Sequence, residues 1–214
     1  MTQLDEIAAG LYRINTATEG GFSFNQYLIK DEKNTLVHTG SVPQFSGIVE
    51  KLSRVINPSD LTYVFVSHFE SDECGALGEF LKLNPGITAL CSAVTARQLT
   101  GFGIPAKVEV VKPGDGLSIG RRELRFISYP SEMHLWEGLL AYESKDKVLF
   151  SSDLFVVRGS EDPPVRKVRA AEALTITPRS IPADDARRKC EAEIRALDIA
   201  LVAVGHGPVL DLRP

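Results

Sequence analysis

The sequence predicts an α/β (α+β) protein in which two β-sheets pack face to face and helices cover their outer surfaces. The first half of the 214-residue chain alternates short apolar runs with segments of helical apolar spacing. The second half holds a series of short strands separated by turn residues. Because this length is near the upper end of what one hydrophobic core organises, and no linker interrupts it, we expect a single domain over residues 1–214.

In the first half, runs of β-branched and aromatic residues are bounded by Gly, Pro, Asn or charged residues. We expect strands at 11–15, 22–30, 35–37, 61–67 and 87–91. Apolar residues recur at helical spacing from Phe45 to Val55, which predicts a helix over 45–56 that Asn57-Pro58 ends. Two further helices are expected, one from 71 or 72 to about 83 and one over 92–99.

In the second half, strands are expected at 108–111, 117–119, 123–129, 139–143 and 147–150, arranged as a meander rather than as βαβ units. A helix over 184–197 and a buried strand over 199–204 follow. The segment 159–182 holds prolines and a basic cluster, so we expect a solvated loop with a short helix near 170–174.

Composition excludes several classes of partner. A net charge of −4 argues against non-specific binding to nucleic acid or to anionic membranes. No apolar run is long enough to cross a membrane, and the amino terminus lacks the pattern of a signal peptide. The three cysteines show no CxxC spacing, which fits a reducing compartment. We therefore expect a cytoplasmic protein.

All four histidines lie where a predicted strand ends. These are His38, His68, His134 and His206, and Asp153 follows a further apolar strand in the same way. Strand ends fix the position of a side chain while the adjoining loops leave room for a ligand. One such histidine is more often a structural hydrogen-bonding residue than a metal ligand, so the residues that surround it decide between the two.

The segment from His68 to Glu73 holds an imidazole and three carboxylates. Residues i and i+2 of an extended backbone point the same way, so His68 and Glu70 can bind one cation. Asp72 and Glu73 stand at a predicted helix N-terminus, where the helix dipole alone would favour acidic residues. That dipole does not account for His68 or Glu70. Carboxylates crowded at a strand end repel one another unless a cation neutralises them, so a metal site is predicted here.

The sequence resembles the metallo-β-lactamase superfamily, and within it the diiron branch of flavodiiron and oxygen-binding diiron proteins. That branch has H-x-E-x-D-H where the zinc hydrolases have H-x-H-x-D-H. Matching pieces extend over almost the whole chain: residues 25–29, 36–40, 68–73, 134–142, 149–153 and 205–208. The resemblance implies a four-layer αββα sandwich.

The resemblance also implies a two-metal site. His68, Glu70 and His134 would hold one metal, Asp72 and His206 the second, and Asp153 would bridge the two. No catalytic residue is expected beyond these ligands.

Two positions depart from the family pattern. Glu73 replaces the final histidine of the motif, and His38 stands where the superfamily usually has aspartate. If Glu73 binds metal, the site has three imidazoles and four carboxylates, whose charge of −4 balances two divalent cations; if it turns away, the second metal is weak. Oxygen-rich ligation favours two iron ions, with manganese or zinc as alternatives. His38 is either structural or a compensating ligand.

The resemblance implies a protein that binds, reduces or senses dioxygen, an oxidoreductase of flavodiiron type. Since no flavodoxin region is present in these 214 residues, we expect no flavin of its own and a separate electron donor. The alternative is a metal-dependent hydrolase of an ester, lactone or thioester, because the same fold hosts both chemistries. A catalytically idle scaffold is a third alternative. We also expect a homo-oligomer, a dimer, acting on dioxygen or another small molecule.

Overall fold

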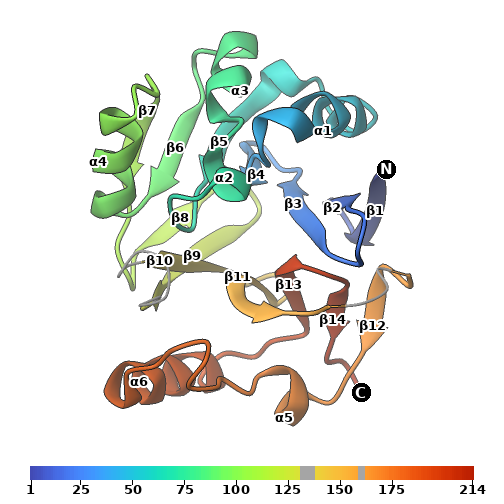
Figure 1. Cartoon of the computed structure of the whole chain (residues 1–214), viewed down its shortest axis with the longest axis vertical. Coiled ribbons are helices and arrows are strands. Elements are labelled where there is room, and N and C mark those ends of the chain that lie inside the picture. Colours follow the sequence, from blue (N-terminus) through green and yellow to red (C-terminus); the bar gives the residue numbers. More distant parts are fainter. Residues whose placement is uncertain (131–137, 159–161) are drawn as a thin grey trace.

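The computed structural model describes residues 1–130, 138–158 and 162–214. Two seven-stranded sheets lie face to face in this part of the chain (Figure 1). Helices α1, α3 and α4 lie outside the first sheet, and α5 and α6 lie outside the second. The four-layer αββα arrangement expected from the sequence is therefore confirmed.

The first sheet has the strand order β1-β2-β3-β4-β5-β6-β7. Strands β1 to β4 pair antiparallel, and β4 to β7 pair parallel. The carboxyl ends of β4, β5 and β6 therefore lie at one edge, where ligand sites of such sheets form. The strands are β1 (Thr2–Ala8), β2 (Leu11–Ala17), β3 (Ser23–Ile29), β4 (Asn34–Val37), β5 (Leu61–Phe65), β6 (Thr88–Cys91) and β7 (Lys107–Val110).

The second sheet has the order β12-β14-β13-β11-β10-β9-β8. Strands β8 to β11 form an antiparallel meander, as predicted from the sequence, and β11 then pairs parallel with β13. The strand predicted at 108–111 as part of this meander is instead β7 of the first sheet, where it pairs parallel with β6. Both strands of that parallel pair end on the side of the metal motif. The strands are β8 (Gly116–Ser118), β9 (Glu123–Tyr129), β10 (Gly138–Glu143), β11 (Val148–Val156), β12 (Val165–Lys167), β13 (Leu201–His206) and β14 (Val209–Asp211).

The helices bury one face each. Ile48 and Leu52, one turn apart on α1, are completely buried against the first sheet, and Cys190 and Ile194 on α6 pack against the second. A third cluster fills the space between the sheets, so each pair of neighbouring layers shares an apolar core. No helix of the described residues is long and apolar enough to cross a membrane. The helices are α1 (Phe45–Leu52), α2 (Ser71–Cys74), α3 (Leu77–Leu83), α4 (Ala93–Gly101), α5 (Ala170–Ala173) and α6 (Asp184–Arg195), with short 3₁₀ helices η1 (Val42–Gln44) and η2 (Pro58–Asp60).

Several elements differ from the prediction, among them β14, a strand after His206 that was not expected and that pairs antiparallel with β13. Strand β1 was not expected, because Ile7 is its only buried residue and no alternation marks it; backbone pairing with β2 holds it. The helix expected from 71 to 83 is broken at Gly75 and Ala76, where the amide of Ala76 donates to the carbonyl of Gly40 instead of continuing the helix. Strand β12 lies in the predicted loop and pairs parallel with β14.

Candidate metal centre

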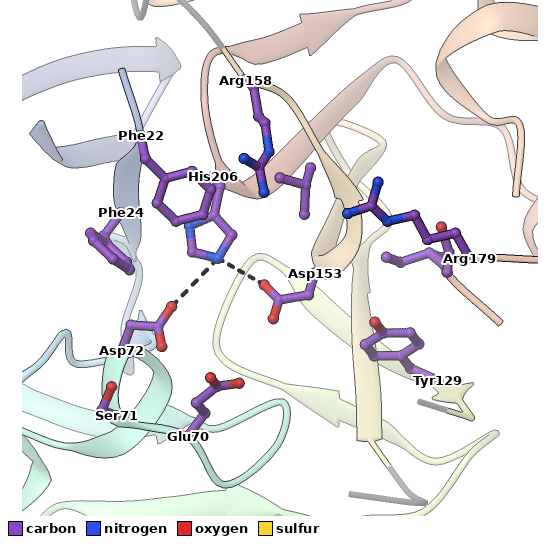
Figure 2. A pocket seen from close by; sticks show the side chains of 13 residues that line it. Phe22, Phe24, Glu70, Ser71, Asp72, Tyr129, Asp153, Arg158, Arg179 and His206 are labelled. Carbon is purple, nitrogen blue, oxygen red and sulfur yellow. Dashed lines mark ion pairs between the residues drawn. The ribbon is translucent and has the colours of Figure 1, made fainter. Parts of the chain in front are cut away.

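The candidate ligands converge from both sheets. His68 and Glu70 follow β5, and Asp72 lies in the first turn of α2. Asp153 lies in β11, and His206 is the last residue of β13. Figure 2 shows Asp72, Asp153 and Glu70 directed toward the imidazole of His206 or toward the space below it. Because the ends of these strands meet at a common edge, the site lies between the two sheets.

A local irregularity of β11 positions Asp153. The pairing register between β11 and β13 shifts on both sides of Ser152, whose φ of 46° is left-handed. Gly205 lies opposite, and a Cβ on it would come within 3.0 Å of Asp153 Oδ1 and 3.1 Å of the Ser152 carbonyl oxygen. Glycine at 205 therefore leaves the space that the Asp153 carboxylate occupies.

Asp153 lies between the two imidazoles. Its Oδ1 is 3.0 Å from Nε2 of His206, and its Oδ2 is 3.6 Å from Nε2 of His68. Each imidazole also contacts a carboxylate of its own. Glu70 Oε2 lies 3.2 Å from Nε2 of His68, and Asp72 Oδ2 lies 3.5 Å from Nε2 of His206. The arrangement is two histidine–carboxylate groups that share one carboxylate.

Glu73 is the most unusual member of the cluster. Its side chain is 1% exposed, and its Oε2 lies 3.7 Å from Nε2 of His68. No donor among the described residues reaches that oxygen. Burial raises the pKa of Glu73 well above its usual value, and the nearby charges of Asp72, Asp153 and Glu70 raise it further. A buried, unsatisfied carboxylate among other acids fits a bound cation, and one ligand atom each of His68, Glu70 and Glu73 lie within 4.8 Å of one another.

The other acids and His206 form a coupled set. Burial raises the pKa of Asp72, and the charge of Asp153 adds to the effect. For Asp153, burial acts in the same direction, but the hydrogen bond and charge of His206, together with His68, lower its pKa overall. Burial would lower the pKa of His206, but the hydrogen bond to Asp153 and its charge raise it. Asp153 therefore favours the charged form, as a bridging ligand requires.

The backbone fixes the ring of His206. Its Nδ1 is 2.9 Å from the carbonyl oxygen of Ser23 in β3. A carbonyl oxygen only accepts hydrogen bonds, so Nδ1 carries the proton. In the neutral ring Nε2 then presents its lone pair toward Asp72 and Asp153, which is the orientation that metal-binding histidines need.

A chain of side chains fixes the ring of His68 instead. Its Nδ1 is 3.1 Å from Ser67 Oγ, and that hydroxyl is 2.9 Å from Nε2 of His38 and 2.8 Å from Ser152 Oγ. His38 has a φ of 64° and is buried, and burial lowers its pKa to about 3, so its ring is neutral. The structure thus places His38 behind His68, in contact with Ser67.

A cavity of about 570 Å³ adjoins the carboxylates and reaches Glu70, Asp72, Asp153 and His206. The rest of its wall includes residues that were not predicted from the sequence, among them Phe22, Phe24, Tyr129, Arg158 and Arg179. Their spacing gave one signal, since the two phenylalanines are two residues apart on a predicted strand and so share a face. The arginines lie outside every motif.

Six of the seven predicted ligands therefore lie together in the structure. The seventh, His134, lies outside the described residues.

The chain is similar to known proteins in both sequence and structure. A family model described as "ODP family beta lactamase" matches residues 22–207. The anaerobic nitric oxide reductase flavorubredoxin of Klebsiella pneumoniae is 36% identical over 138 residues, which is 63% of this chain and 28% of that protein. The chain spans about a third of the length of the curated relatives it matches.

Solved structures show the same fold. The Flv1 flavodiiron core of Synechocystis sp. PCC6803 superposes with a TM-score of 0.84 at 23% identity, over 98% of this chain and 57% of that one. The rubredoxin oxygen:oxidoreductase of Desulfovibrio gigas gives a TM-score of 0.81 at 21% identity, again over 98% and 57%. The resemblance to the diiron branch of the metallo-β-lactamase superfamily is thus confirmed, and the chain belongs to the ODP beta-lactamase family.

Proposed function

We propose that this chain holds two iron ions and binds or reduces dioxygen at them. The observation that carries the proposal is Asp153, whose two oxygens face the imidazoles of His68 and His206 in two adjoining groups of ligands. Among the relatives, the Klebsiella protein is named a nitric oxide reductase and the Desulfovibrio structure an oxygen:oxidoreductase. Both names point to a diatomic substrate.

The charge of the cluster supports two divalent cations. Glu70, Asp72, Glu73 and Asp153 together carry four negative charges when ionised, which two divalent ions neutralise. We propose that Glu73 is a ligand in this set, and that His134 completes the group around His68 and Glu70. Oxygen-rich ligand sets suit iron or manganese better than softer donors do.

The residues around the site orient and hold its ligands. The Ser23 carbonyl contacts Nδ1 of His206, and the Ser67 hydroxyl contacts Nδ1 of His68. These contacts fix the rings so that both Nε2 atoms face the carboxylates. Two iron ions, when bound, supply electrons and open coordination positions for a diatomic molecule. Complete reduction of dioxygen takes more electrons than two ferrous ions hold, so turnover needs an external donor.

The remaining parts of the proposal concern the protein's surroundings. We propose that residues 1–214 act as one domain that carries no flavin of its own and receives electrons from a flavin held elsewhere. A cytoplasmic location and a homodimer belong to the same proposal. Size-exclusion chromatography with light scattering tests the dimer directly.

The test of the central proposal combines metal analysis with oxygen uptake. Protein made in iron-replete cells should contain iron near two per chain, and the anaerobically reduced protein should consume dioxygen in an electrode chamber. Zinc-reconstituted protein is the control, because zinc has no redox chemistry. Full iron loading without oxygen uptake would refute the oxygen proposal.

Hydrolysis is tested with the same preparations. If the zinc-loaded protein turns over esters, lactones or thioesters with a rate that tracks its metal content, the hydrolase alternative replaces the one proposed here. We expect no such turnover above that of metal-free protein.

A further inference from the structure

The cavity beside the candidate metal centre is larger than its proposed substrate needs. At about 570 Å³ it falls within the range of roughly 300–1,000 Å³ that is typical of pockets for small organic molecules. A diatomic molecule occupies on the order of tens of Å³, comparable to one water. The residues that line this extra space indicate what it can bind.

Two arginines line this cavity on the side away from Glu70 and Asp72. Figure 2 shows the guanidinium groups of Arg158 and Arg179 entering from separate segments, above Asp153 and His206. Within the described part of the chain neither guanidinium has a carboxylate partner, whereas Arg187 and Arg188 of α6 pair with acids one turn away. Arginine is suited to the recognition of carboxylate or phosphate groups, because its planar fork matches their geometry.

Aromatic rings complete the wall. The ring of Phe22 stacks on His206, with centroids 4.4 Å apart and planes 26° apart, and Arg158 lies 5.6 Å from the centre of the same ring. Phe24 lies edge-on to both rings, and Tyr129 lines the cavity near Asp153. The cavity thus combines apolar faces with two cationic donors, which is the usual composition of a pocket for a small organic ligand.

Charge balance points in the same direction. This step rests on the proposed function: two divalent cations would neutralise the four carboxylates and leave Arg158 and Arg179 as unbalanced positive charges. Both arginines are exposed, so they also face incoming molecules. A positively charged rim attracts anions and disfavours cations.

We propose that the cavity binds a small organic anion, with Arg158 and Arg179 holding its carboxylate or phosphate group and the aromatic rings contacting its apolar part. The anion would lie in this cavity beside the metal ligands Asp153 and His206. The class of ligand is therefore a small organic molecule with an apolar part and a carboxylate or phosphate group.

The experiment measures binding to the full chain loaded with zinc, by isothermal titration calorimetry. Zinc keeps the carboxylates neutralised but supports no oxygen chemistry, so the result is independent of whether the iron protein consumes dioxygen. The probes are phenyl phosphate and benzoate, which distinguish the two oxyanions, and benzyl alcohol, which has the ring without the charge. The variants are Arg158→Gln, Arg179→Gln and the double variant. Arg97→Gln is the matched control, because Arg97 is an exposed arginine on α4 outside the cavity.

We expect phenyl phosphate, benzoate or both to bind the zinc protein, and benzyl alcohol to bind much more weakly. Each single variant should weaken binding of the anion by about 13-fold, which corresponds to the lower end for a hydrogen bond to a charged group. The double variant should weaken it further, and Arg97→Gln should leave it unchanged. Two results would overturn the proposal: no binding of either anion at millimolar concentration, or equal binding by the wild type and the double variant. In the second case the anion is a ligand of the metal and not of the arginines.

Discussion

The two imidazoles of the candidate metal centre are held in different ways. His206 is fixed by the main chain, because its Nδ1 faces the carbonyl oxygen of Ser23. His68 is fixed by side chains, since its Nδ1 faces the hydroxyl of Ser67, which in turn contacts His38. A carbonyl group accepts only, whereas a hydroxyl group both donates and accepts.

Because of this difference, substitution of the neighbouring serine can change the tautomer of His68 but not that of His206. A change of side chain at position 23 leaves the carbonyl oxygen in place, so the His206 tautomer is insensitive to it. The tautomer of His68 depends on the direction of a hydrogen-bonded chain. For Nε2 to face a metal, Nδ1 must donate to a serine hydroxyl, that of Ser67 at 3.1 Å or that of Ser152 at 3.4 Å. When Ser67 accepts from His68, it donates in turn to His38 or Ser152. Partners of this kind change metal affinity by about 10–100-fold when removed.

Asp153→Asn tests what the two halves share. The amide keeps the shape of the side chain but removes the charge between His68 and His206, so we expect both metals to be lost, with total metal content falling to a small fraction of the wild-type value. Elemental analysis by mass spectrometry measures it. Asp198→Asn is the control, because Asp198 is exposed and pairs with Lys147 outside the site. Retention of one metal per chain would show that the two halves bind independently.

The sequence associated Glu73 with the second metal, that of Asp72 and His206, whereas the structure places its Oε2 3.7 Å from Nε2 of His68. Glu73 therefore tests the His68 half. If it is a ligand, Glu73→Ala should lower the affinity of one metal by at least about 10–100-fold, since loss of a direct ligand exceeds loss of an outer partner. Glu73→His restores the residue of the family motif and should restore occupancy. Competition with a chelator measures the metal affinity of both variants. Unchanged occupancy in Glu73→Ala would place this carboxylate outside the metal shell.

The sequence predicted the fold well because the strand and helix patterns reflect burial. Strand β9 alternates as expected, with Leu124 and Phe126 buried and Arg125 exposed, and the helical stripe of α6 buries Cys190 and Ile194. Strands β1 and β12 could not be predicted in this way. Both lie at sheet edges and are held by backbone pairing, which leaves no apolar pattern.

The candidate site was predictable only in part, for a related reason. His68, Glu70 and Asp72 belong to one motif, so their spacing indicated a metal site. The wall of the cavity was not predictable, because Phe22, Arg158 and Arg179 come from segments far apart in the sequence. Only the folded sheets bring them beside His206.

The burial of Glu73 gives a test of stability against pH in metal-free protein. Its pKa in the folded state is raised above the usual 4.5, so the stabilising contribution of the protonated form is present below about pH 4.5 and is lost as pH rises through the raised pKa. Glu73→Gln should therefore unfold like the wild type at low pH. At neutral pH it should be more stable by on the order of 1–3 kcal/mol, the usual cost of an unsatisfied buried polar group.

Urea unfolding of both proteins, stripped of metal, measures this difference across the pH range. Metal-loaded samples should show the opposite order, because the bound cation stabilises the ionised carboxylate and adds binding energy to the folded state. A constant difference at all pH values would mean that Glu73 does not titrate with a raised pKa. The two sets of samples therefore distinguish the effect of burial on stability from the effect of metal binding at Glu73.

The smallest expected effect distinguishes the two histidines most directly. Ser67→Ala removes the hydroxyl that contacts both His68 Nδ1 and His38 Nε2, so we expect metal affinity to fall by about 10-fold, the lower end for an outer partner. Ser67→Thr keeps the hydroxyl and should retain affinity. Ser23→Ala is the matched control, because the carbonyl that holds His206 remains and only a 3.3 Å contact from the Gly207 amide to the Ser23 hydroxyl is lost. Nitrogen NMR of metal-free protein, in which no metal fixes the tautomer, should show a mixture of His68 tautomers in Ser67→Ala alone, while His206 keeps its proton on Nδ1 in all three variants. Equal losses of affinity in Ser67→Ala and Ser23→Ala, with both tautomers unchanged, would contradict the distinction and assign these serines to packing.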